Sequence, residues 1–313
     1  MTKEEYYFPS ADGESSIHGI RWLPDGKPTA VLQIVHGMVE YVGRYEEFAA
    51  FLCENGFAVF GHDHVGHGLS AADESRLGLM KGRHPSDTMV GDVYSNYLLG
   101  KKLWPELPFF ILGHSMGSYM LRKFLSVKAD SLHGLSGAIV MGTGQEPLLT
   151  VNAGLFLVDV LKLFKGPDHR SPFIRDMTYS ASYKRYDCCG KDYSRSWLSK
   201  NLPNVEKYYH DPFCTYLFSL NGYRGLIEST KFDAQQKNVE KMPKELPVLL
   251  VSGAEDPVGA LGEGVKKVYA SFRKAGLSDV SMKLYGGDRH EILNELDRTE
   301  VYSDLLKWMV EHE

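Results

Sequence analysis

The residues best suited to catalysis lie in the segment Gly113-His114-Ser115-Met116-Gly117, which has the spacing G-x-S-x-G. The apolar run Phe109–Leu112 before it predicts a strand, and the residues after it predict the start of a helix. A serine at such a turn is forced into strained backbone angles, and its hydroxyl stands clear of the sheet. Gly113 and Gly117 have no Cβ that would collide with the neighbouring strand and helix. We therefore predict that Ser115 is a nucleophile.

A nucleophilic serine needs a base to take its proton and an acid to orient that base, because its hydroxyl is almost never ionised near neutral pH. In the fold that uses this turn, the chain order is serine, acid, histidine. The run Pro247–Val251 predicts a strand that leads into a tight turn holding Glu255 and Asp256. We assign the orienting acid to Asp256. Glu255 is the second candidate, and we expect it to face solvent.

Two histidines follow Asp256 in the chain, His290 and His312. His312 is the penultimate residue, and we expect it to fray at the end of the last helix. His290 comes shortly after the predicted strand Val280–Tyr285 and directly before a predicted helix. We therefore assign His290 as the base that takes the proton from Ser115 and later passes it to the leaving group.

Two backbone N–H groups must meet the negative oxygen that develops on the substrate carbonyl. The residue after the nucleophile, Met116, supplies one of them, and the loop after the third predicted strand supplies the other. That loop is His36-Gly37-Met38, in which Gly37 permits a close approach of the backbone and Met38 provides the N–H. Taken singly, these residues have ordinary structural explanations, such as a turn serine or a capping aspartate. Their order along the chain favours catalysis.

Strands and helices alternate along most of the chain and predict a mainly parallel sheet with helices on both faces. The alternation stops at about Gly144 and resumes after Lys231. We therefore predict an α/β catalytic domain, residues 1–144 and 232–313, with an inserted helical cap, residues 145–231. The predicted elements are strands Tyr6–Phe8, Ile17–Trp22, Ala30–Val35, Phe57–Phe60, Phe109–Leu112, Leu135–Met141, Pro247–Val251 and Val280–Tyr285, and helices Tyr45–Asn55, Pro85–Leu103, Glu263–Ala275 and Glu291–Val310.

The predicted cap contains amphipathic, aromatic-rich segments: Leu155–Phe164, Thr178–Tyr186 and Phe213–Phe218. Because the cap is inserted between two strands of one sheet, it should lie over their carboxyl ends, where open α/β sheets bind ligands. The first segment is mostly apolar and can line a pocket for an acyl chain or contact a lipid surface. Residues 159–200 include nine Lys/Arg and five Asp/Glu, an excess that suits anionic lipids, although a solvated face is the simpler explanation.

The composition is that of an ordinary globular protein, with 43% hydrophobic and 24% charged residues. The net charge of −5 gives no reason to expect a nucleic acid partner. The four cysteines lack C-x-x-C spacing and are too sparse for a disulfide framework, so we expect reduced thiols and a cytoplasmic location. The N-terminus has no signal-peptide core, and no apolar run reaches the length of a membrane span. The sequence does not indicate an oligomeric state.

The segment Gly61–Ser70 holds three histidines and Asp63 within a few positions, a spacing that zinc sites also use. We favour a structured loop beside the active site, in which Asp63 and the histidines bond to backbone groups. The serine chemistry needs no metal, and the sequence offers no evident distant fourth ligand. We therefore predict neither a metal nor a cofactor.

With these residues in place, the chain resembles the monoacylglycerol lipase and lysophospholipase-like serine hydrolases of the α/β-hydrolase fold, including bacterial members. The resemblance is carried by His36–Tyr41 with Arg44-Tyr45, Asp63–Ser70, the serine turn, Asp211–Cys214, Gly253–Val258 and Arg289–Glu295. It implies the same roles as above for Ser115, Asp256, His290, Met38 and Met116, and a structural role for the loop around His64 and His67. The chain departs from the family at Tyr41, Val65 and Ser118, where the family usually has His, Arg and Gly.

The resulting hypothesis is a serine ester hydrolase that works through an acyl-enzyme on monoacylglycerol or lysophospholipid-type esters, with transient contact between the cap and a membrane surface. A general carboxylesterase and a peptidase that releases N-terminal residues are alternatives on the same fold. A peptidase needs an acidic group in the cap to bind the α-amine, and Asp159, Asp168 or Asp176 can supply it. The intact set of catalytic residues disfavours a non-catalytic binding scaffold.

Overall fold

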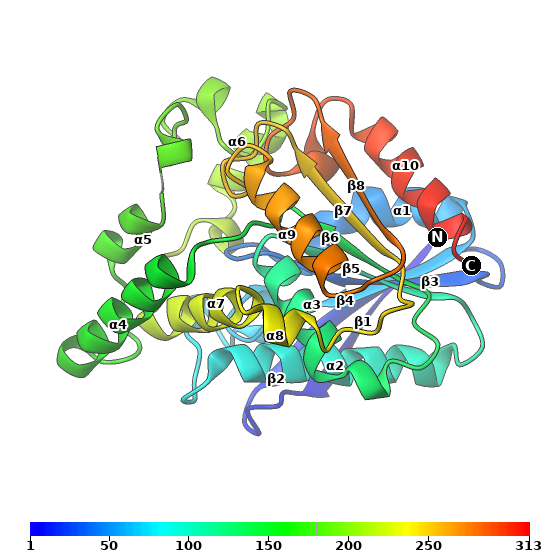
Figure 1. Cartoon of the computed structure of the whole chain (residues 1–313), viewed down its shortest axis with the longest axis horizontal. Coiled ribbons are helices and arrows are strands. Elements are labelled where there is room, and N and C mark those ends of the chain that lie inside the picture. The colour runs from blue at the N-terminus through cyan, green and yellow to red at the C-terminus, as the bar shows by residue number, and fades with distance from the viewer. Residues whose placement is uncertain (180) are drawn as a thin grey trace.

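The computed structural model describes residues 1–179 and 181–313. Its centre is an eight-stranded sheet in the order β1-β2-β4-β3-β5-β6-β7-β8 (Figure 1). β2 pairs in antiparallel fashion with β1 and β4, and the other neighbouring strands are parallel. The strands are β1 Thr2–Pro9, β2 Ser16–Leu23, β3 Ala30–Val35, β4 Phe57–His62, β5 Phe109–His114, β6 Gly137–Met141, β7 Val248–Gly253 and β8 Val280–Tyr285.

Helices cover both faces of this sheet, because its central strands carry apolar side chains on both sides. In β5, Phe109 and Ile111 belong to one buried core and Phe110 and Leu112 to the other, as the two-residue period of a strand requires. The first core is packed by α2, α3 and α9, and the second by α1 and α10. These helices are α1 Glu46–Glu54, α2 Pro85–Leu103, α3 Met116–Val127, α9 Glu263–Lys274 and α10 Arg298–Val310. The predicted α/β-hydrolase fold class is confirmed.

The predicted closing helix is the main correction to the catalytic domain. The sequence predicts a helix over Glu291–Val310, but α10 begins only at Arg298. The backbone of Glu295 is extended, and its carboxylate accepts the backbone N–H of Arg289 at 2.9 Å. A tertiary contact of this acid therefore overrides the helical pattern of the sequence.

The segment 145–231 lies between β6 and β7 and contains α4 (Leu148–Lys165), α5 (Pro172–Thr178), α6 (Leu202–His210) and most of α7 (Leu220–Asp233), which the short α8 (Gln236–Val239) follows. α7 packs against α2 and α3, and Val158 and Tyr223 join the same buried core as those helices. α4 and α5 extend away from the sheet at the left of Figure 1. The division into a catalytic domain and a cap stays a prediction.

Within this segment the sequence predicted one helix well and others poorly. α4 contains the predicted Leu155–Phe164, whereas only a short 3-10 turn overlaps Phe213–Phe218. The predicted Thr178–Tyr186 includes residue 180, which lies outside the described residues. α6 and α7 were not predicted, and α7 contains two glycines, which weaken a helical pattern. Among the residues described, no helix has the length and apolar character needed to cross a bilayer.

Candidate active site

Ser115 lies between the end of β5 and the start of α3, in the predicted strand-turn-helix. Its backbone angles, φ +52° and ψ −121°, are strained as expected, and its N–H donates to the carbonyl of Met141 at 3.0 Å. A Cβ on Gly113 would lie 2.5 Å from the carbonyl oxygen of Gly117, and a Cβ on Gly117 would lie 2.0 Å from that of Val35. Both glycines are therefore required for the turn to pack against the sheet.

The structure brings the predicted acid and base together. Nδ1 of His290 lies 3.0 Å from Oδ2 of Asp256, which is fully buried in the turn after β7. Burial alone would raise the pKa of Asp256, but His290 and the donors Val258 N–H and Ser252 Oγ–H outweigh it and lower that pKa. The ionised carboxylate can hold the proton on Nδ1, which leaves Nε2 as the nitrogen available to accept a proton from Ser115.

The second candidates for these two roles lie elsewhere. Glu255 is half-exposed, and its carboxylate is 3.8 Å from Arg185. His312 lies at the end of α10, where its Nε2 is 3.1 Å from the carboxylate of Asp279. The ring of His290, in contrast, lies 4.7 Å from the ring of His114, the residue that precedes Ser115.

The predicted oxyanion donors line one cavity together with Ser115. Among the described residues, neither the N–H of Met38 nor that of Met116 has a hydrogen-bond partner, so both remain available to a substrate oxygen. The N–H of Gly37 is already donated to the carboxylate of Glu40. Val39 follows with φ +56°, a strained angle for a β-branched residue, and its carbonyl accepts the hydroxyl of Tyr208 at 3.2 Å. This loop is thus held from two sides.

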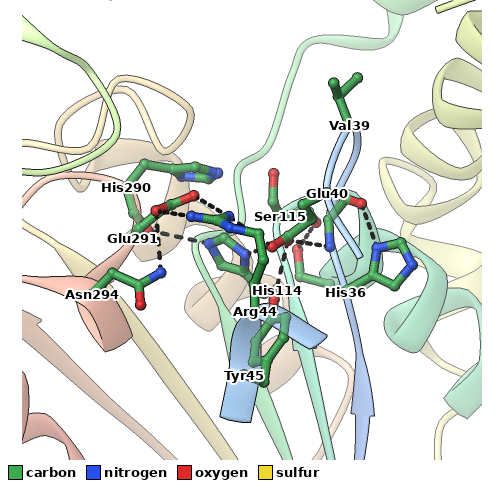
Figure 2. Close-up of polar contacts among 12 residues, drawn as sticks. His36, Val39, Glu40, Arg44, Tyr45, His114, Ser115, His290, Glu291 and Asn294 are labelled. Carbon is green, nitrogen blue, oxygen red and sulfur yellow. Dashed lines mark hydrogen bonds and ion pairs between the residues drawn. The ribbon is translucent and has the colours of Figure 1, made fainter. Parts of the chain in front are cut away.

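A buried charged network lies beneath the oxyanion loop (Figure 2). The Glu40 carboxylate accepts from the N–H of Gly37 and from the hydroxyl of Tyr45, and it lies 3.1 Å from Nδ1 of His114. Nε2 of His114 is 3.3 Å from the carbonyl oxygen of His290. Burial opposes both charges, yet their pairing lowers the pKa of Glu40 and raises that of His114. One ion pair therefore connects the oxyanion loop, the nucleophile strand and the loop of His290.

A second ion pair extends this network to the histidine loop. The guanidinium of Arg44 donates to both carboxylate oxygens of Glu291, at 2.6 and 2.8 Å, and also to Glu40 at 3.1 Å. The amides of Asn204 and Asn294 complete the hydrogen bonding of Glu291. Glu40, Arg44 and Glu291 do not stand out by residue type or spacing, and only the family resemblance, which includes all three, points to them.

Two histidines of Gly61–Ser70, His64 and His67, lie at hydrogen-bond distance from backbone carbonyls, whereas Nδ1 of His62 lies 3.2 Å from the side-chain amide of Asn96. Nε2 of His36 accepts the N–H of His64 at 2.9 Å, and Nδ1 of His67 lies 3.1 Å from the carbonyl of Val65. Burial lowers the pKa of His64 to about 4 and that of His67 to about 3, so both rings are neutral. Asp63 accepts the backbone N–H groups of Val42 and Leu69. Across residues 1–179 and 181–313, no three His, Cys, Asp or Glu side chains are arranged to hold a metal.

A cavity of about 730 Å³ opens above Ser115. Its aliphatic lining includes Val151 of α4 and Leu226 and Ile227 of α7. Its aromatic lining comes mainly from the segment between α5 and α7. The aromatic residues are Tyr119, Tyr179, Tyr183, Tyr193, Trp197, Tyr208, Tyr209, Tyr216 and Tyr223.

The charged side chains of the described cavity lining are Glu146 and Arg175. None of the three aspartates predicted as amine-binding groups lines the described part of the cavity. Asp159 instead binds Arg224 at 2.7 Å, and Asp176 binds Arg175 at 2.7 Å. The cavity is therefore suited to an apolar or weakly polar substrate rather than to a charged amine.

Comparisons with known proteins identify the family of this chain. Residues 26–297 match the family described as serine aminopeptidase, S33. The chain is 28% identical over 276 residues to monoglyceride lipase of Rattus norvegicus, covering 88% of this chain and 80% of that protein. It is 26% identical over 322 residues to monoacylglycerol lipase of Mycolicibacterium smegmatis, covering 99% and 98%. The crystal structure of a thermostable carboxyl esterase from Bacillus coagulans, in complex with glycerol, superposes with a TM-score of 0.90 at 28% identity, covering 100% and 99%.

Proposed function

The chain belongs to the serine aminopeptidase S33 family, and we propose that it hydrolyses the ester bond of monoacylglycerol-type lipids rather than peptides. One observation carries this proposal: the strained Ser115 lies at a large, mostly apolar cavity, near the bonded pair Asp256–His290. The monoglyceride lipases among the relatives support the substrate class. Lysophospholipids, which carry the same acyl-glycerol ester, are the second substrate within this class.

The proposed reaction uses the protein's own groups. Ser115 Oγ attacks the ester carbonyl while Nε2 of His290 takes its proton, and Asp256 stabilises the imidazolium that results. The N–H groups of Met38 and Met116 bind the tetrahedral oxyanion. His290 then returns the proton to the alcohol, which leaves an acyl-enzyme. Water, activated by the same histidine, attacks the acyl carbonyl and releases the fatty acid and the free Ser115 hydroxyl.

The cavity argues for an ester and against the aminopeptidase alternative. A peptide α-amine is positively charged and needs a nearby acid when it leaves water. Glu146 is the acidic side chain of the described lining, and it is solvent-exposed on the approach to α4. The aliphatic lining of the cavity, with Val151, Leu226 and Ile227, instead matches an acyl chain.

We also propose that α4 contacts a lipid surface. Leu149, Phe156 and Leu163 recur every seven residues along one stripe of this helix and are 83%, 72% and 84% exposed. The opposite stripe includes Val151, which lines the cavity. A helix that contacts lipid on one side and the cavity on the other would take its substrate directly from the surface.

The four cysteines are free thiols, which supports a reducing, cytoplasmic location.

The proposed function is tested with Ser115→Ala and a matched control on the same helix, Ser126→Ala. Ser126 donates its hydroxyl to the carbonyl of Arg122 at 3.1 Å and takes no part in the site. We expect Ser115→Ala to lose fluorophosphonate labelling and at least about a thousandfold in monoacylglycerol hydrolysis, and Ser126→Ala to retain both. A panel of p-nitrophenyl esters should show a preference for acyl chains longer than acetate. Hydrolysis of aminoacyl anilides in place of the esters would favour the peptidase.

A further inference from the structure

The cavity wall next to His290 is aromatic. The indole of Trp197 lies 5.0 Å from the imidazole of His290 between ring centroids, with 32° between their planes. Tyr183 meets Trp197 edge-on at 5.5 Å, and Tyr179 meets Tyr183 at 5.2 Å. All three line the cavity above Ser115. Tyr179, Tyr183 and Trp197 thus form a continuous surface that begins at His290, and we call it the aromatic wall.

Backbone contacts fix the end of this wall against the loop of His290. The N–H of His290 donates to the carbonyl of Trp197 at 3.4 Å. The guanidinium of the preceding Arg289 donates to the carbonyls of Ser196 and Ser199, at 2.6 and 3.3 Å. Both attachments use main-chain oxygens on either side of the indole. The position of Trp197 relative to the imidazole is therefore set by the backbone and not by the indole itself.

The direction of proton transfer indicates which part of the substrate lies beside the aromatic wall. His290 gives its proton to the oxygen of the leaving alcohol, so that alcohol must lie beside His290. The acyl chain extends from the same carbonyl carbon away from that oxygen, and the cavity lining offers it aliphatic side chains such as Val151 and Ile227. The group that lies against the aromatic wall is therefore the alcohol part of the substrate.

We propose that the aromatic wall is the subsite for the leaving alcohol, that it favours alcohols carrying an aromatic ring, and that Trp197 is its specificity-determining residue. This inference rests on the proposed ester hydrolysis and extends it to a class of alcohol. The rings of the wall already meet at tilted and edge-on angles, which aromatic quadrupoles favour. A substrate ring continues the same arrangement, whereas a saturated ring of equal size gains only burial.

The test uses three hexanoate esters that share one acyl chain: the benzyl, cyclohexylmethyl and glyceryl esters. For the wild type we expect kcat/KM for the benzyl ester to exceed that for the cyclohexylmethyl ester by about three- to tenfold. Trp197→Leu should reduce this ratio to about one, and Trp197→Phe should restore most of it. Trp104→Leu is the matched control, because Trp104 lies at the C-terminal end of α2, where it packs against Phe60 and does not line the described part of the cavity, and should leave the ratio unchanged.

Equal kcat/KM for the benzyl and cyclohexylmethyl esters in the wild type would overturn the inference. An equal loss on all three esters in Trp197→Leu would also overturn it, because a purely structural role has that signature. If Trp197→Leu does not fold, the same ratio is measured in Tyr183→Leu, which should also lower it, and an unchanged ratio there overturns the inference. Wild-type hydrolysis of the glyceryl ester without an aromatic preference rejects only the aromatic subsite. Failure to hydrolyse the glyceryl ester rejects the proposed function itself.

Discussion

Replacing Glu40 by glutamine tests whether the buried ion pair positions the active site. Glu40 is 4% exposed, and its carboxylate binds the Gly37 N–H, the Tyr45 hydroxyl and the ring of His114. Glu40→Gln keeps the volume and an oxygen that can accept the Gly37 N–H. It removes the negative charge, so it isolates the contribution of the ion pair with His114.

The expected loss of stability and activity in Glu40→Gln can be estimated from the contacts of the Glu40 carboxylate. Removing one partner of a buried ion pair costs about 3–5 kcal/mol of stability, because the other charge stays buried without compensation. Arg44 keeps its bidentate contact with Glu291, so we expect the lower end of this range, about 3 kcal/mol. Activity should fall further than stability suggests, because a misplaced oxyanion donor costs roughly a hundredfold or more in kcat. KM should change little, since Glu40 does not line the cavity.

The contribution of the Glu40–His114 ion pair to stability should depend on pH in a characteristic way. The pKa of Glu40 is lowered in the folded protein, so its contribution is present above the unfolded value of about 4.3 and is lost as the pH falls below it. The pKa of His114 is raised, so its contribution is fully present below about 6.5 and is lost as the pH rises through the higher folded value. The joint contribution is therefore largest between about pH 4.3 and 6.5.

The assays are urea unfolding at several pH values and steady-state kinetics on a soluble ester. Glu46→Gln is the matched control, because Glu46 forms an exposed ion pair with Lys3 and should lose less than about 0.5 kcal/mol. The reasoning is refuted if Glu40→Gln unfolds at the wild-type urea concentration between pH 5 and 6. It is also refuted if the loss of activity appears in KM with kcat unchanged.

Three further predictions concern the nucleophile turn, the triad and the lipid-facing helix. Asp256→Asn should lower kcat by about 10⁴-fold on a soluble ester, because the imidazole loses its required tautomer. Gly117→Ala should prevent folding or abolish fluorophosphonate labelling, because the added Cβ meets the backbone oxygen of Val35 at 2.0 Å. The triple exchange of exposed α4 residues to serine should lower hydrolysis of vesicle-bound monoacylglycerol severalfold and leave a soluble ester unaffected; equal loss on both substrates would contradict lipid contact. The residues exchanged are Leu149, Phe156 and Leu163.

The parts of the site that the sequence predicted are those in which chemistry restricts both residue type and chain order. A nucleophile turn needs glycine at fixed positions, and the fold admits one order of acid and histidine after it. These two restrictions were enough to select Asp256 and His290 over Glu255 and His312. The sheet was predictable for a similar reason, because fully buried strands such as β3 and β7 appear as short apolar runs bounded by turn residues.

The supporting residues follow no such local rule. Glu40 and Glu291 are charged residues in loops and Arg44 lies in a short 3-10 helix, and a single sequence gives each of them the appearance of a solvated side chain. Their burial is explained only by mutual pairing, and Arg44 and Glu291 are 247 positions apart. The same holds for Trp197, because its partner His290 lies far along the chain. Long-range pairing of this kind leaves no periodic pattern.

Mutations in the buried ion pairs and mutations in the aromatic wall should have different effects. The ion pairs of Glu40 and Arg44 hold the loops through their side chains, so an exchange there disturbs catalysis itself. The aromatic wall is attached to the loop of His290 through main-chain carbonyls around Trp197, which any residue provides. A different side chain at position 197 therefore alters the surface offered to the alcohol without loosening that attachment. Alcohol selectivity and the catalytic step should accordingly be separable in this protein, with the first set by the wall and the second by the buried charges.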